Sequence, residues 1–244
     1  MSPVRAILFD KDGTLFDFHA TWSEWSAGFL LRLAGGDLER ARILGEAIGF
    51  DLDTRSFLDG ALVVGGTPDD IAHALLPHLP GATPFSLVSR MNSETARIPQ
   101  KEAAPLKSLL GDLRQTGLKL GVATNDCVAP AEAHLAQAGI EGFFDHIIGC
   151  DSGYGAKPEP GMLLGFADYV GVPPEEVVMV GDSVHDLNCG RGAGARCVGV
   201  LTGSAQRSAL EPLADIVLPS IASLPVWLSG LNMADSGARP EAVL

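Results

Sequence analysis

The feature that most constrains the fold of this chain is a regular alternation of apolar and amphipathic segments after residue 101. Residues 118–123 are apolar and bounded by turn residues, as expected of a buried strand. Residues 106–117 carry leucines at the i, i+3, i+4, i+7 spacing of an amphipathic helix that ends at a glycine. Further strands are expected at 146–149, 177–180, 197–201 and 215–218, and helices at 130–138, 160–170, 184–191 and 221–228. This alternation predicts a parallel sheet covered by helices on both faces.

One further strand is expected near the start of the chain, at residues 4–9. The segment from about residue 20 to 97 has no convincing series of strands and reads instead as helices at 21–33, 38–48, 68–79 and 84–98. We therefore predict an α/β protein with a doubly wound, Rossmann-like parallel sheet and an all-helical cap domain inserted after the first strand. The expected boundaries are 1–17 and 99–231 for the core, 18–98 for the cap, and 232–244 for a flexible C-terminal tail.

Charge and composition exclude several classes of partner. The net charge of −13 over 244 residues argues against binding of nucleic acid or of an anionic membrane surface. We find no signal-peptide pattern and no apolar run of membrane-spanning length, and we expect a cytoplasmic protein. The four cysteines, Cys127, Cys150, Cys189 and Cys197, have no C-x-x-C spacing and are expected to be reduced thiols.

The residues that follow the first strand are Asp10-Lys11-Asp12-Gly13-Thr14. In an extended chain Asp10 and Asp12 share one side, whereas Lys11 points to the other, so we assign Lys11 no chemistry. Crowded carboxylates repel each other and need a cation, a shared proton or solvent. The alternative interpretation of this segment is an Asp-Gly turn after an edge strand.

Polar residues also follow the later strands. Thr124 and Asn125 come after the strand at 118–123, Lys157 precedes a helix, and Asp182 and Asp186 follow the strand at 177–180. Ligands of such sheets bind at the carboxyl ends of the strands, so these residues are expected to converge there. Each also has a structural alternative, as a helix-capping residue or a solvated lysine. The Lys157–Pro158 bond is a candidate for a cis peptide.

These four segments, in this order, resemble the motifs of haloacid dehalogenase superfamily phosphohydrolases, and are most similar to the phosphoglycolate phosphatase branch with a helical cap. The resemblance covers most of the chain. It implies that Asp10 is a nucleophile that forms an aspartyl-phosphate and that Asp12 is the general acid and base. It further implies that the phosphate group of the substrate is bound by Thr124, Asn125 and Lys157.

The resemblance also implies a metal site. The metal would be held by Asp10, by the main-chain carbonyl of Asp12 and by Asp182, and Asp186 would orient a water bound to it. Oxygen ligands with retained waters suit Mg²⁺. Nothing in the sequence indicates a ligand role for His185, which is expected on a helix surface.

The implied function is hydrolysis of a small phosphomonoester by a Mg²⁺-dependent phosphatase, with phosphoglycolate first and other small organic phosphates next. The alternatives are a phosphomutase of the β-phosphoglucomutase type, a dehalogenase, and a non-catalytic scaffold with this fold. The expected partner is a small phosphorylated metabolite, with no nucleic acid and no membrane, and the protein is expected to be a monomer or homodimer.

The motifs leave the substrate preference to the cap. The candidates at its start are His19, Trp22 and Trp25. These side chains either face the leaving group or pack within the cap. Polar candidates further along the cap are Arg55, Ser56 and Asp59.

Overall fold

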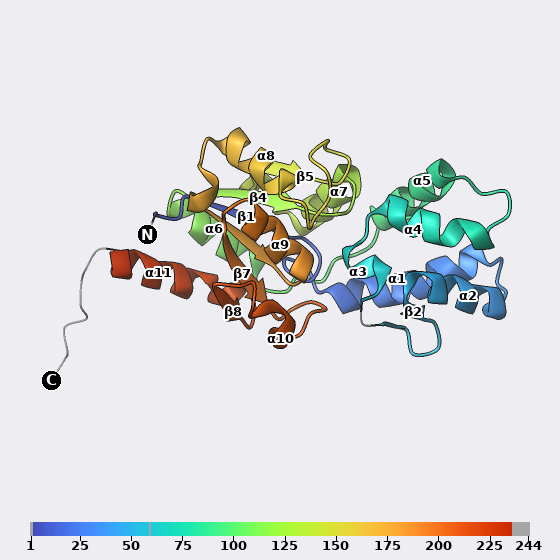
Figure 1. The fold of residues 1–244 in the computed structure, drawn as a ribbon. Helices are drawn as coiled ribbons and strands as arrows, with labels where there is room; N and C mark the ends of the chain where they lie inside the picture. The colour runs from blue at the N-terminus through green and yellow to red at the C-terminus, as the bar shows by residue number, and fades with distance from the viewer. Residues whose placement is uncertain (1, 59, 236–244) are drawn as a thin grey trace.

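The computed structural model describes residues 2–58 and 60–235 and contains a six-stranded parallel sheet with the order β5-β4-β1-β6-β7-β8 (Figure 1). The strands are β1 (Ala6–Phe9), β4 (Lys119–Ala123), β5 (His146–Ile148), β6 (Val177–Gly181), β7 (Arg196–Val200) and β8 (Ile216–Leu218). β1 lies in the middle, and Phe9 is in register with Val122 of β4 and Val180 of β6. The residue after β1 is therefore placed between the ends of two neighbouring strands, where the strand order reverses.

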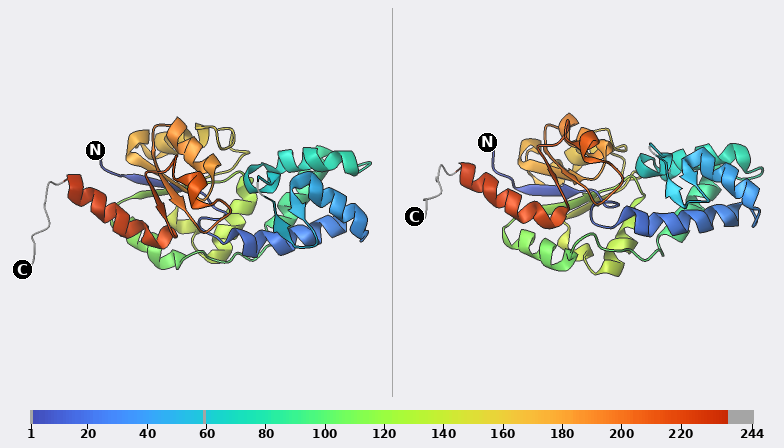
Figure 2. Two further views of the ribbon diagram at one scale, coloured as in Figure 1. Left: turned by 60° about the horizontal axis from the view of Figure 1, so that its bottom comes forward. Right: turned by 90° about the horizontal axis from the view of Figure 1, so that it is seen from below.

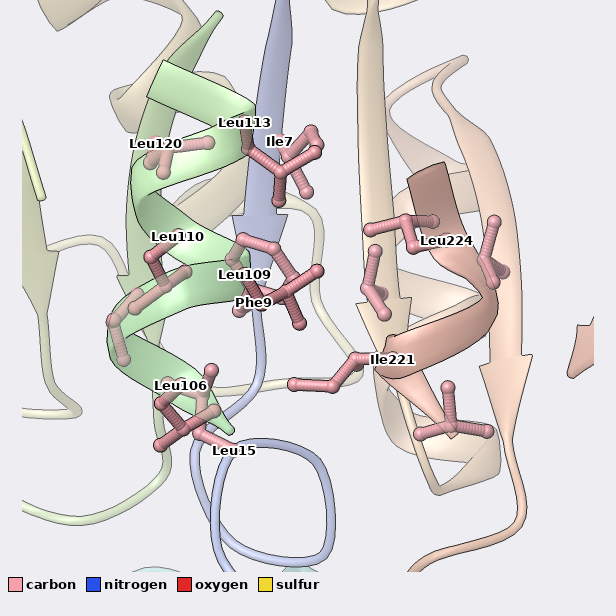
Figure 3. Packing of buried hydrophobic residues seen from close by; sticks show 14 of the residues in the cluster. Ile7, Phe9, Leu15, Leu106, Leu109, Leu110, Leu113, Leu120, Ile221 and Leu224 are labelled. Atoms are coloured by element: carbon pink, nitrogen blue, oxygen red, sulfur yellow. The ribbon is translucent and has the colours of Figure 1, made fainter. Parts of the chain in front are cut away.

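The two faces of the sheet bury different helices because successive side chains of β1 point to opposite faces. Ile7 and Phe9 belong to a buried cluster that α6 (Leu106–Gln115), α7 (Val128–Ala138) and α11 (Leu224–Asp235) cover, and Figure 3 shows part of this cluster beside α6 and at the start of α11. Ala6 and Leu8 belong to a second buried cluster, formed with α8 (Gly161–Val170), α9 (Val184–Gly192) and α10 (Arg207–Leu210). The predicted doubly wound α/β fold is confirmed.

Between β1 and α6 the described residues form five α-helices, and we call this segment the helical insertion: α1 (Phe18–Leu33), α2 (Leu38–Ile48), α3 (Leu62–Gly65), α4 (Pro68–Leu75) and α5 (Pro84–Thr95). The insertion lies at one end of the core in all three views (Figures 1 and 2). It buries an apolar cluster of its own, centred on residues such as Leu30, Leu44 and Leu75. An antiparallel pair of two-residue strands, β2 (Phe50–Asp51) and β3 (Ser56–Phe57), departs from the all-helical prediction, because segments this short leave no periodic pattern.

Several helix ends differ from the prediction, and two of these differences lie near the predicted domain boundaries. α1 begins at Phe18 rather than at residue 21, because the Asp17 carboxylate caps it by accepting a hydrogen bond from the Ala20 amide at 3.0 Å. At the other end of the chain α11 continues to Asp235, so residues 232–235 are helical although they fall in the segment predicted as a tail. No glycine or proline interrupts residues 231–235. The rest of the predicted tail, residues 236–244, lies outside the described residues. Across the described part of the chain we find no helix that is both long and apolar enough to span a membrane.

Candidate active site

Asp10 and Lys157 form the centre of the site, at the carboxyl edge of the sheet. The Asp10 amide donates to the Val180 carbonyl at 2.8 Å, which continues the β1–β6 ladder and places the carboxylate at the strand ends. Lys157 Nζ donates to Asp10 Oδ1 at 2.6 Å, to Asp186 Oδ1 at 2.7 Å and to the Ala123 carbonyl at 2.9 Å. The lysine is buried and is not the solvated surface charge of the alternative interpretation. The Lys157–Pro158 peptide is cis, as predicted.

Three carboxylates gather on one side of this lysine. Oxygens of Asp10, Asp182 and Asp186 lie within 4.8 Å of one another, and all three residues are buried. Asp182 Oδ2 accepts from the Ser204 amide at 2.8 Å, and Asp186 Oδ2 accepts from the Ser183 hydroxyl at 2.6 Å. Asp10 Oδ2 has no hydrogen-bond partner among the residues that the structure describes.

The turn after β1 needs a glycine to make room for this cluster. Gly13 has a φ of +85°, and a Cβ there would lie 2.5 Å from the Asp182 carboxyl carbon. Any other residue would be strained and would collide with the cluster. The approach of Gly13 to Asp182 brings the first and the last of the four motifs together.

The electrostatics of the cluster call for a cation. Burial raises the pKa of Asp10 to about 7, and the charge of Lys157 offsets this only in part. Burial and the neighbouring carboxylates raise the pKa of Asp182 well above its ordinary value. A hard divalent cation would stabilise the ionised forms, and carboxylate oxygens are the ligands it prefers. The donor set and the unpartnered Asp10 oxygen therefore fit a divalent metal.

Lys11 corrects the sequence-based expectation. Its fully buried amine forms ion pairs with Asp12 and, at 2.9 Å, with Asp126 Oδ2, and it lies 3.2 Å from His134 Nδ1. The alternation rule fails because the chain leaves the extended conformation here: the Lys11 carbonyl accepts from the amides of both Leu15 and Phe16. Lys11 therefore contacts the second aspartate of the motif.

Asp10 and Asp12 both line a cavity at the strand ends, but the carboxylate of Asp12 has partners of its own. Oδ1 accepts from the Trp22 indole at 2.9 Å, and Oδ2 pairs with Lys11. Burial opposes ionisation of Asp12, but Lys11 and the Trp22 hydrogen bond outweigh it and hold the pKa of this carboxyl below its ordinary value. Trp22 belongs to α1, so the helical insertion contacts a residue of the first motif directly.

Thr124 and Asn125 also line the cavity, yet the structure gives the Asn125 side chain a different contact from the one expected. Its amide nitrogen donates to the carbonyls of Gly65, at 2.7 Å, and of Lys157, at 2.9 Å, and its oxygen accepts from the Lys157 amide at 2.9 Å. Asn125 thus holds the Lys157 segment in place and ties it to α3. Thr124 Oγ1 accepts from the Asp126 amide at 3.1 Å, which leaves the hydroxyl hydrogen to donate elsewhere.

Several residues of the site were missed or misplaced. His185, which was expected on a helix surface, lines the cavity and faces Gly65 of α3. Ser204, which binds Asp182, follows β7, so the strand-end rule that found the other segments would have found it as well.

Cys127 and Cys150 are free thiols whose sulfurs lie 3.9 Å apart.

The candidates in the insertion separate into two groups. Trp22 and Trp25 line the cavity. His19 is exposed and is not among its lining residues, Arg55 forms a surface ion pair with Glu24, and Ser56 is exposed. Asp59 lies outside the described residues.

The molecule is an α/β protein with a doubly wound parallel sheet. Buried carboxylates and a lysine gather at the carboxyl edge of the sheet, where such folds bind their ligands. Residues 4–194 match the family model described as haloacid dehalogenase-like hydrolase, and the chain belongs to this family. This confirms the family predicted from the four segments.

Two curated relatives cover almost the whole chain. A phosphoglycolate phosphatase of Rhodospirillum rubrum is 29% identical over 234 residues, which are 92% of this chain and 90% of that protein. The pyrophosphatase PpaX of Bacillus velezensis is 32% identical over 225 residues, 91% of this chain and 94% of that one. The family and these relatives place the chain among hydrolases of the phosphatase type.

Among solved structures, CbbY of Rhodobacter sphaeroides in complex with xylulose-(1,5)bisphosphate is 26% identical, with a TM-score of 0.64. The match covers 91% of this chain and 96% of that one. It supports the same fold over most of the chain.

Proposed function

We propose that this protein is a Mg²⁺-dependent phosphatase that hydrolyses a small organic phosphomonoester through an aspartyl-phosphate on Asp10. The observation that carries the proposal is the state of the Asp10 carboxylate. One of its oxygens is held by Lys157, and the other has no hydrogen-bond partner among the described residues. A buried, oriented carboxylate with an available oxygen is suited to attack phosphorus.

The other residues have roles that follow from their positions. Lys157 would neutralise charge on the nucleophile and on the phosphoryl oxygens, and the Thr124 hydroxyl would donate to one of those oxygens. Mg²⁺ bound by Asp10, Asp182 and the Asp12 main-chain carbonyl would supply further charge neutralisation. Asp12, which its lowered pKa keeps ionised in the free protein, would take a proton from the attacking water, and it would donate to the leaving oxygen only after taking up a proton in the substrate complex. General acid–base roles of this kind are typically worth about 10²–10⁴ in rate.

The test is a phosphate-release screen over small phosphomonoesters, with and without Mg²⁺. We expect release that depends on Mg²⁺ and stops on addition of a chelator. A phosphomutase would need a bisphosphate primer and return the phosphoryl group to a sugar, and a dehalogenase would act without the metal. A protein inert to a broad panel with Mg²⁺ would contradict the proposal and favour a non-catalytic role.

Mg²⁺ should stabilise the fold, and more so at higher pH. Because the pKa of Asp10 is higher in the folded chain than its ordinary value, the folded state binds more protons. The contribution of Asp10 to stability therefore falls as pH rises from about 4 to about 7, and a cation should restore it. At a hundredfold excess over its Kd, Mg²⁺ should add about 2.7 kcal/mol to the free energy of unfolding.

This prediction is checked by thermal unfolding with and without Mg²⁺ at about pH 5 and about pH 8. The rise in Tm caused by Mg²⁺ should be larger at the higher pH and absent in Asp182→Asn. Asp112→Asn, which changes an exposed aspartate of α6, is the matched control and should keep the full rise. A rise in Tm that Asp182→Asn leaves intact would place the metal elsewhere.

Contact between α3 and α9 should be needed for turnover. A Cβ at Gly65 would lie 2.5 Å from Cδ2 and Nε2 of His185, so in Gly65→Val either the His185 ring or α3 must move away from this contact. We expect kcat/KM to fall by about 10²-fold, since small displacements at a catalytic site have effects of this size. The Tm should change little.

Two further variants control for this effect. Gly142→Ala adds a methyl group where no atom lies within 4 Å and should be neutral. Adding His185→Ala to Gly65→Val should restore part of the lost activity by removing the collision. Full activity of Gly65→Val alone would show that this contact is dispensable.

A further inference from the structure

A cavity that is partly open to solvent extends from Asp10 into the helical insertion. Its catalytic end is lined by the residues described above. Its other end is lined by large apolar side chains from several helices of the insertion, among them Trp25, Phe29, Ile71 and Met91. Trp25 and Phe29 stack with ring centroids 4.7 Å apart and form a continuous aromatic wall. The part of the cavity that would receive the leaving group is therefore apolar.

Most of the charged side chains that line this cavity are acidic. Among the described residues that line it, the acidic side chains number five: Asp10, Asp12, Asp126, Asp182 and Asp186. The lysine among them, Lys157, has its amine already engaged by Asp10 and Asp186. No lining residue from the described part of the insertion carries a charge. A carboxylate or second phosphate on the leaving group would be buried there without a counter-charge, which is costly.

Two polar atoms at the apolar end lack partners. The indole nitrogen of Trp25 and the hydroxyl of Ser26 are buried and make no hydrogen bond to any described residue. Both residues line the cavity. Buried polar groups in proteins are almost always paired, so one uncharged acceptor on a bound molecule would satisfy the indole, which can only donate.

We propose that the leaving group of the substrate is an uncharged, mainly apolar alcohol of aryl or arylalkyl type, carrying a single polar atom near Trp25 and Ser26. This inference rests on the proposed phosphatase function. It separates this chain from its relatives, since the substrates in their names, phosphoglycolate and pyrophosphate, carry a second anionic group. The catalytic end of the site would bind the phosphoryl group of either kind of substrate, and the apolar end would select the uncharged leaving group.

The test compares three probes with Mg²⁺: benzyl phosphate, phosphoglycolate and acetyl phosphate. Benzyl phosphate and phosphoglycolate are both esters of primary alcohols, and they differ in whether the alcohol is aromatic or anionic. We expect kcat/KM for benzyl phosphate to exceed that for phosphoglycolate by at least about tenfold. Acetyl phosphate, whose leaving group is small, reports the phosphoryl chemistry itself.

The outcomes are distinguishable. Turnover of acetyl phosphate together with equal or better use of phosphoglycolate than of benzyl phosphate would overturn this inference and leave the proposed function intact. Inactivity on all three probes would overturn the proposed function, and this inference with it. A binding measurement that needs no turnover is calorimetry with benzylphosphonate and phosphonoacetate, for which we expect the same tenfold order in Kd.

A variant can reverse the preference. Ile71 is half-buried at the apolar end, and Ile71→Lys would place a cation there. We expect it to shift the ratio of kcat/KM toward phosphoglycolate by about tenfold or more. Phe85→Ala, which removes an exposed aromatic ring from α5, is the matched control and should leave the ratio unchanged. An unchanged ratio in a folded Ile71→Lys protein would contradict the assignment of this end to the leaving group.

Discussion

Replacing Asp10 with asparagine should lower kcat for phosphate release by at least about 10⁴-fold, because an amide cannot attack phosphorus and the losses on removing a nucleophile are of this order or larger. The change removes one of three crowded buried carboxylates, so the fold should not be weakened. The measurement is steady-state phosphate release, together with acid-quench trapping of the phosphoenzyme. Wild-type protein should be labelled by a phosphoryl donor, and Asp10→Asn should not.

The control separates chemistry from charge. Asp112→Asn makes the same change of charge on the exposed surface of α6 and should retain activity and labelling. Substantial turnover by Asp10→Asn with an unchanged Tm would mean that Asp10 is not the nucleophile, and would favour direct attack by water.

Replacing Lys157 with methionine should have the largest effect on stability. Lys157 Nζ is the cationic partner of both Asp10 and Asp186 at 2.6–2.7 Å, and all three groups are buried. Removing one member of a buried ion pair typically costs about 3–5 kcal/mol because the remaining charge is left uncompensated. We expect a loss of this size in the free energy of unfolding without metal, and loss of phosphate release.

The loss should depend on pH with a defined sign. Without Lys157 the pKa of Asp10 should rise further above its value of about 7, so the folded state would hold its proton over a wider range. Destabilisation should then be smallest at acidic pH and grow as pH rises through neutrality. Lys107→Met, which changes an exposed lysine of α6, should show neither effect. A loss of stability that is independent of pH would indicate a packing defect instead of an unpaired charge.

The convergence of the four segments could be predicted from sequence because it follows from topology. Parallel strands present their carboxyl ends at one edge, so residues that follow β1, β4 and β6 must meet there, however far apart they are in the chain. Alternation of apolar and amphipathic segments identified these strands to within one or two residues. The same reasoning predicts that Asp10 and Asp182 lie at this edge, and Lys157 reaches Asp10 from the loop between β5 and α8.

Side-chain direction at the same positions could not be predicted. Lys11 was expected to point away from both aspartates, but the tight turn after Phe9 brings its amine to Asp12. Asn125 was expected to bind phosphate, yet its amide group ties Lys157 and Gly65 together. Both outcomes depend on the local turn and on a partner distant in sequence, and strand periodicity carries no information about either.

The sequence by itself determined the α/β class, the place of the helical insertion and the identity of the chemical groups, since these depend on local periodicity and on strand ends. Only the tertiary structure decided what the insertion places over the site. In the sequence Ile71 and Met91 look like ordinary core residues, and only the packing of the helices shows that they line a cavity. A local sequence pattern shows that a side chain is apolar. Whether that side chain packs against another residue or faces a cavity depends on contacts between helices that are far apart in the chain.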